Sequence, residues 1–165
     1  MFEDVARLAV KFDGVVACND VGAEWSGALD GWVTLHPKKF REWSAARERN
    51  GFARAGRMVG HRPEVGLPDR EIEVSEYKFP GQQTSGSSGL FAAKFALVDL
   101  GFDRAILCGI PMSNRPHFFD DKNWMGHAGF REAWFGVPEV YRLRMRSMSG
   151  WTMALLGSPR DWEDN

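Results

Sequence analysis

The sequence has few cysteines, and both lie in apolar surroundings. Cys18 and Cys108 are the only two among 165 residues, and each falls in an apolar run that we predict to be a strand. Buried thiols behave as small hydrophobic groups, so two packed free thiols in a reducing cytoplasm are the simpler interpretation. A disulfide or a pair of metal ligands is the alternative.

The net charge is close to zero, and long apolar runs are absent from the sequence. The 21 Lys and Arg residues nearly balance the 22 Asp and Glu residues, which argues against a basic face for nucleic acid. No run approaches the roughly 18 apolar residues of a membrane span. The start, Met1-Phe2-Glu3-Asp4, is unlike the basic start of a secretory signal. We therefore expect a cytoplasmic protein without a membrane partner, located in the host cytoplasm or the virion if a phage encodes it.

Familiar motifs of catalysis and cofactor binding are absent as well. The sequence contains no P-loop, no G-x-G-x-x-G fingerprint and no G-x-S-x-G elbow. None of the four histidines stands at a metal-ligand spacing from Asp, Glu or Cys. We expect neither a metal nor a bound cofactor.

The pattern of apolar residues that is present predicts a single α/β domain with a mostly parallel sheet. We expect helices over 2–11, 38–50, 90–100, 120–135 and 151–156, and strands over 15–18, 32–35, 71–77, 105–110 and 141–147. The helix over 90–100 is apolar on nearly every face, which is typical of a buried helix. Residues 51–70 show no period and predict an irregular surface excursion.

Polar clusters follow the predicted strands, where the carboxyl ends of parallel strands meet and ligands commonly bind. The clusters are Asn19-Asp20, His36, the loop Thr84-Ser85-Gly86-Ser87-Ser88, the loop with Asn114, Arg115 and His117, and Arg146-Ser147 with Ser149-Gly150. This arrangement predicts a pocket along one edge of the sheet.

The loop over 84–88 has two interpretations. Backbone N–H groups and hydroxyls at the start of a helix form an anion site, which would suit a phosphate. A serine that caps the helix, with a glycine in a tight turn, requires no ligand at all. Both interpretations stay open from the sequence.

Two histidines and one arginine are the candidate reactive or binding side chains. His36 and His117 are candidate acid–base catalysts because imidazole is the side chain suited to proton transfer at neutral pH, although each is equally typical of a hydrogen-bonded loop histidine. Arg146 lies nearest the end of its predicted strand and is a candidate phosphate or carboxylate ligand. The row Arg142, Arg144 and Arg146 is otherwise typical of a solvated strand face.

The segment TSGSSGLFAAKFALVDLGFDRAILCGIPM over 84–112 resembles a Rossmann-like transferase group that includes bacterial sialyltransferases and 6-hydroxymethylpterin pyrophosphokinase-like proteins. VVACND over 15–20 and GWVTLHP over 31–37 are similar to strands of the same group. The resemblance covers about residues 2–112 and implies a Rossmann-like three-layer sandwich.

The resemblance also implies a ligand, a nucleotide or a nucleotide-activated group. The residues that it places near this ligand are Asn19, Thr84, Ser85, Gly86 and Gly109, with His117 as a basic group. Members of the group usually carry a further strand and a Gly-Ser loop before the helix matching 2–11, and an aspartate where Pro111 stands here. We therefore expect the first strand of the fold to be missing.

Two functions follow as expectations. The first is a nucleotide or nucleotide-sugar binding protein of transferase ancestry, whose own activity the sequence leaves undecided. The alternative is a non-catalytic structural or interaction subunit, for example a phage virion or assembly component, which forms a homo-oligomer or binds a virion partner. The missing strand and the seven tryptophans, more than a small core usually requires, favour this alternative.

Overall fold

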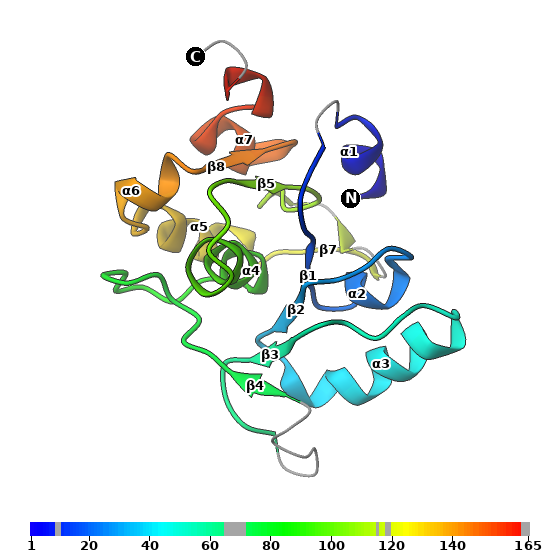
Figure 1. The fold of residues 1–165 in the computed structure, drawn as a ribbon. Helices are drawn as coiled ribbons and strands as arrows, with labels where there is room; N and C mark the ends of the chain where they lie inside the picture. The colour runs from blue at the N-terminus through cyan, green and yellow to red at the C-terminus, as the bar shows by residue number, and fades with distance from the viewer. Residues whose placement is uncertain (9–10, 65–71, 115, 118–119, 163–165) are drawn as a thin grey trace.

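The computed structural model describes residues 1–8, 11–64, 72–114, 116–117 and 120–162. A four-stranded parallel sheet organises the first half of the chain (Figure 1), in the order β1 (Val16–Cys18), β2 (Gly31–Thr34), β3 (Met58–Gly60) and β4 (Glu73–Val74). The register aligns Cys18 with Val33 and Val33 with Val59. The predicted α/β class with a parallel sheet is confirmed.

Four further strands form two separate two-stranded sheets. β5 (Ala105–Leu107) pairs in parallel with β8 (Met145–Ser147), and β6 (Pro116–His117) pairs in antiparallel fashion with β7 (Asp120–Asn123). The helices are α1 (Phe2–Ala6), α2 (Val21–Glu24), α3 (Phe40–Arg49), α4 (Ser88–Lys94), α5 (His127–Phe135), α6 (Glu139–Arg142) and α7 (Gly150–Leu156). Three short helical segments join them, η1 (Pro37–Lys39), η2 (Phe95–Asp99) and η3 (Pro159–Trp162).

Helices cover both faces of the four-stranded sheet, because successive side chains of a strand point to opposite faces. On β2, Trp32 packs with Phe40 of α3, and Val33 packs with Phe91 of α4. Figure 1 shows α3 and α4 on opposite sides of the strands. All four residues of β2 are consequently buried.

The helix α4 is buried along its whole length, as its apolar sequence predicts. One side of it faces the sheet, and Leu90 and Ala93 on another side join a second core with Leu107 of β5, Trp134 of α5 and Met145 of β8. This helix therefore links the four-stranded sheet to the C-terminal elements.

The continuation of α4 into η2 is a π-helix, in which Leu100 N–H donates to Phe95 O over 2.9 Å. The buried ammonium of Lys94 lies 2.7 Å from Asp99 Oδ2 and 3.0 Å from Ser75 Oγ. Because a π-turn spaces its partners five residues apart, the Lys94–Asp99 pair matches the local helix type.

Several predicted elements are wrong, and tertiary pairing explains most of the differences. The interval 51–70 contains β3, which lies inside the sheet, and Val59 is fully buried. A three-residue strand is too short to show a period in sequence. The predicted helix over 120–135 begins only at His127, since 120–123 forms β7 in a hairpin with β6.

The predicted strand over 141–147 is also wrong in its first half. Helix α6 extends to Arg142, and β8 begins only at Met145. Leu143, which the alternation places on a buried face, is 63% exposed. The three arginines therefore do not form one solvated strand face. Within the described residues, no helix is long and apolar enough to cross a membrane.

Candidate functional site

The ends of β1 and β2 come together through a buried hydrogen-bond network. Thr34 is fully buried, and its hydroxyl donates to Asn19 Oδ1 over 2.8 Å. Trp32 Nε1 donates to Asn19 O over 2.6 Å. Asn19 has a positive φ of 54°, a conformation that asparagine adopts more readily than most residues. The sequence prediction thus places Asn19 at the correct edge, where its amide oxygen already accepts a bond.

Asp20 follows directly and precedes α2 without a side-chain capping bond to it. The pKa of the Cys18 thiol is raised to about 12. Burial of the thiol is the larger cause, and the negative charge of the Asp20 carboxylate is the smaller one. Cys18 and Cys108 are both free thiols, in agreement with the simpler interpretation of the sequence. A thiol with such a pKa stays protonated and unreactive at neutral pH.

The start of α4 reaches the same edge of the sheet. Ser88 Oγ accepts from Leu35 N over 3.3 Å, just beyond β2. Ser87 caps the helix, its hydroxyl accepting from Leu90 N over 3.4 Å. Of the two interpretations of the loop over 84–88, the capping serine is thus present, and both hydroxyls serve internal bonds.

The beginning of that loop, Thr84 to Gly86, contacts other elements than the end of β2. Thr84 O accepts from the Gln82 side chain, and the Thr84 hydroxyl lies beside Gly136 at the end of α5. Gly86 is buried so tightly against Leu90 that an added β-carbon would come within 2.4 Å of it. Ser85 is exposed. Thr84 and Gly86 therefore act mainly in packing the loop against α5 and α4.

Two histidines stand at the carboxyl ends of β2 and β3. His36 is exposed, and its backbone N–H donates to the Thr34 hydroxyl over 2.9 Å. The ring of His61 lies 5.8 Å from that of Tyr77. Its Nδ1 is buried and has no hydrogen-bond partner among the described residues. His61 is a site residue that the sequence pattern missed, because the strand before it was not recognised.

Several groups determine the protonation of His61. Burial is the largest cause and lowers its pKa, and the charges of Arg62 and His36 lower it further. A hydrogen bond to the Thr34 backbone acts in the opposite direction but does not reverse the shift. Because the ordinary value is near 6.5, the His61 imidazole is neutral at pH 7.

We call the group Asn19, Thr34, His36, His61 and Ser88 the carboxyl edge. These side chains come from β1, β2, β3, α4 and the segments that follow the strands, and each is linked to Thr34 or its neighbour by a bond or an electrostatic contact. The group combines the hydrogen-bonded side chains of Asn19, Thr34 and Ser88 with two imidazoles. Such a combination can bind polar groups and exchange protons.

Gly109 lies at the end of β5, but its amide is already bonded. Its N–H donates to Asp4 Oδ2 over 2.8 Å, and the Ser149 hydroxyl donates to the same oxygen over 3.0 Å. Burial alone would raise the pKa of Asp4. The pKa is nevertheless below its ordinary value, because the carboxylate accepts hydrogen bonds from Gly109, Arg7 and Ser149 and lies near the N-terminal ammonium. Helix α1 therefore covers the predicted ligand-proximal position.

The remaining predicted residues lie away from the carboxyl edge or outside the description. Arg146 Nη1 donates to Leu143 O over 3.2 Å and to Met145 O over 2.8 Å, and its guanidinium lies 4.9 Å from the Trp162 ring centroid. His117 belongs to β6, but its side chain is outside the described part of the chain, as is Arg115. The structure therefore does not place these two side chains in any site.

In the described residues, no group of three or more His, Cys, Asp or Glu side chains could hold a metal ion. Comparison with family models, with curated proteins and with solved structures finds no match to this chain.

Proposed function

We propose that this chain binds a nucleotide-type small molecule at the carboxyl edge, as a Rossmann-like protein of transferase ancestry would. The observation that carries the proposal is the convergence of three strand ends and one helix start on Thr34 and Leu35, with His61 Nδ1 left without a partner among the described residues. Ligands of open parallel sheets bind at this edge.

The chemistry of His61 favours a ligand with hydroxyl groups. A neutral imidazole that donates through one nitrogen accepts through the other. We assign the donating nitrogen to the Thr34 backbone contact, which leaves Nδ1 as the acceptor. A ribose hydroxyl is a suitable donor for it once a side-chain rearrangement uncovers this buried nitrogen. His36, exposed beside it, is the group that can contact the phosphate or the base.

Titration with CMP, GMP, ATP and nucleotide-sugars is expected to raise the melting temperature and change tryptophan fluorescence. Trp32 reports on the edge because its indole N–H bonds to Asn19 O. His61→Ala removes the acceptor and should weaken binding by about fivefold to tenfold, the value of one hydrogen bond.

The control for this titration is His127→Ala, which removes a histidine whose ring bonds to Trp124 O on another element. It should leave nucleotide affinity unchanged. Absence of any shift at millimolar concentrations of all four ligands would contradict the proposal. If His61→Ala binds these ligands as tightly as the wild type, the ligand lies away from the carboxyl edge, and the proposal is contradicted equally.

The second candidate is an interaction subunit, and a surface feature favours it. Four large apolar side chains are strongly exposed on or beside α5, α6 and α7: Phe135 (58%), Val140 (62%), Leu143 (63%) and Met153 (40%). A contiguous apolar patch is typical of an association surface, and we propose that these four side chains form one. By contrast, Trp32 and Trp134 are fully buried, so part of the tryptophan surplus belongs to the core.

Light scattering is expected to find a homodimer or larger assembly at high micromolar concentration if this second function holds. The double variant Val140→Asp and Leu143→Asp should then be monomeric, because two charges would be buried in the interface. Val74→Asp changes another exposed valine, which is 50% exposed on β4, and serves as the control. A wild-type chain that stays monomeric removes most of the support for this candidate and contradicts its homo-oligomeric form.

A further inference from the structure

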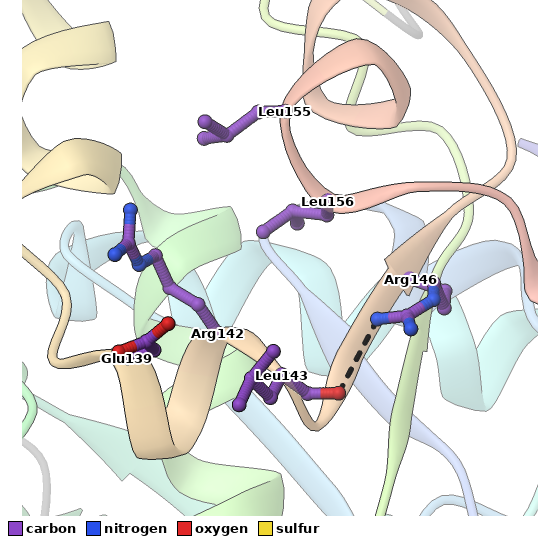
Figure 2. Close-up of a pocket in the computed structure, with 6 residues that line it drawn as sticks. All are labelled: Glu139, Arg142, Leu143, Arg146, Leu155 and Leu156. Atoms are coloured by element: carbon purple, nitrogen blue, oxygen red, sulfur yellow. Dashed lines mark hydrogen bonds between the residues drawn. The ribbon is translucent and has the colours of Figure 1, made fainter.

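A cavity of about 210 Å³ opens between α6, β8 and the end of α7 (Figure 2), and none of its lining residues belongs to the carboxyl edge. It is lined by Glu139, Arg142, Leu143, Arg146, Leu155 and Leu156. Figure 2 shows Arg142 and Arg146 on opposite sides of the two leucines of α7. The site therefore combines cationic groups with an apolar wall.

Arg142 and Arg146 each carry a donor in this cavity that lacks an acceptor, since the Nε of both is buried without a partner among the described residues. A buried donor of a charged group that loses water without gaining an acceptor is costly, so native structures usually supply one. The guanidinium of Arg142 thus has one unused donor and lies beside a space large enough for several waters or a small molecule.

Arg146 is held in place by the backbone rather than by an acid. Its Nη1 bonds to Leu143 O and Met145 O, and Trp162 lies against its guanidinium. Neither arginine forms an ion pair within 4.0 Å with another described residue. Both positive charges therefore remain uncompensated by a direct ion pair at the cavity.

Glu139 is the one acidic side chain of the lining, and it is exposed at the start of α6. With two arginines against one glutamate, the lining carries a net positive charge. Leu143, Leu155 and Leu156 supply no hydrogen-bonding side-chain group, so they suit aliphatic carbon and not further oxygens. The lining thus fits a ligand with one anionic end and an apolar remainder.

We propose that this cavity binds a small organic acid, whose carboxylate accepts hydrogen bonds from Arg142 and whose short aliphatic chain lies on Leu155 and Leu156. A carboxylate accepts two parallel N–H bonds from one guanidinium edge, a strong and directional pairing. Inorganic phosphate is a poorer fit, because its remaining oxygens would face the leucines.

The test uses the full chain with leucine methyl groups labelled for NMR, titrated with acetate, propanoate, butanoate and pentanoate. Saturable shifts are expected for methyl signals of Leu155 and Leu156. Affinity should rise by about threefold to fourfold for each added methylene, as burial of a CH₂ group predicts. Arg142→Gln should weaken binding by at least about tenfold, the value of a charge-assisted bond pair.

Two further variants separate binding from a change in folding. Glu139→Gln removes a repelling charge from the exposed rim and should strengthen carboxylate binding about twofold. Arg49→Gln removes an exposed arginine of α3, outside the cavity lining, and should have no effect. The proposal is overturned if shifts do not saturate, if Arg142→Gln and Arg49→Gln bind alike, or if inorganic phosphate binds more tightly than pentanoate.

Discussion

Replacing Arg47 by methionine is expected to lower the free energy of unfolding by about 3–5 kcal/mol, the cost of breaking a buried charged network. Arg47 is 2% exposed, and its guanidinium donates to four backbone carbonyls. The acceptors are the oxygens of Gly22 (2.8 Å), Trp25, Gly27 (3.0 Å) and Ala53. Methionine keeps much of the volume but supplies no donor for any of them.

Lysine at the same position should be nearly as damaging. Its ammonium is a compact point charge, whereas the planar guanidinium spreads donors toward carbonyls on separate segments. Burial already lowers the pKa of Arg47, and a buried lysine loses its proton far more readily than arginine. Arg47→Lys therefore leaves some carbonyls without a donor even when the fold survives.

Urea denaturation followed by circular dichroism measures both variants. The expected result is a lower midpoint with an unchanged slope, because the amount of surface exposed on unfolding stays similar. The matched control is Arg49→Met on the exposed face of the same helix, which should change stability by less than about 0.5 kcal/mol. Equal midpoints for Arg47→Met and Arg49→Met would show that the four bonds contribute nothing net.

The network of Arg47 also explains how the segment after β1 is held. Three of its acceptors lie within or just after α2, and the fourth follows α3. Helix α3 thus fixes the connection between β1 and β2. Nothing in the sequence distinguishes Arg47 from the exposed Arg41 and Arg49 of the same helix, since all three occur in one charged stretch.

Elements with strong local patterns could be predicted from the sequence. The helix over 90–100 is apolar on nearly every face, and α4 with η2 is buried in the structure as expected. The strands over 15–18 and 32–35 were found because they combine β-branched residues with flanking polar turns. Their parallel pairing in one sheet follows the same prediction.

Elements that depend on distant partners could not be predicted. The strand β3 is three residues long and gains its identity from pairing with β2 and β4, not from any periodicity. Missing it also hid His61, which the structure places beside Thr34. For the candidate site, Asn19, His36 and Ser88 are expected at the sheet edge and lie there, whereas Arg146 lines a cavity elsewhere.

Lys94→Met is expected to lower the free energy of unfolding by about 2–3 kcal/mol. This loss is smaller than the loss expected for breaking a fully buried ion pair. The Lys94 side chain is 5% exposed, and its partner Asp99 is 22% exposed. Removing the ammonium leaves a partly exposed carboxylate, with Ser75 Oγ at 3.2 Å as its remaining hydrogen-bond partner. Thermal and urea unfolding measure the loss.

The double variant Lys94→Met with Asp99→Leu should be more stable than the sum of the single effects predicts, because it leaves no unpaired, partly shielded charge. The same variants examine the π-turn. If the ion pair selects the five-residue spacing, the Phe95 O to Leu100 N–H bond should lose amide-exchange protection in Lys94→Met while protection in the preceding turn persists. Equal protection in all variants would mean that packing of Phe95 and Leu97 alone determines the π-helix, and that the pair only stabilises it.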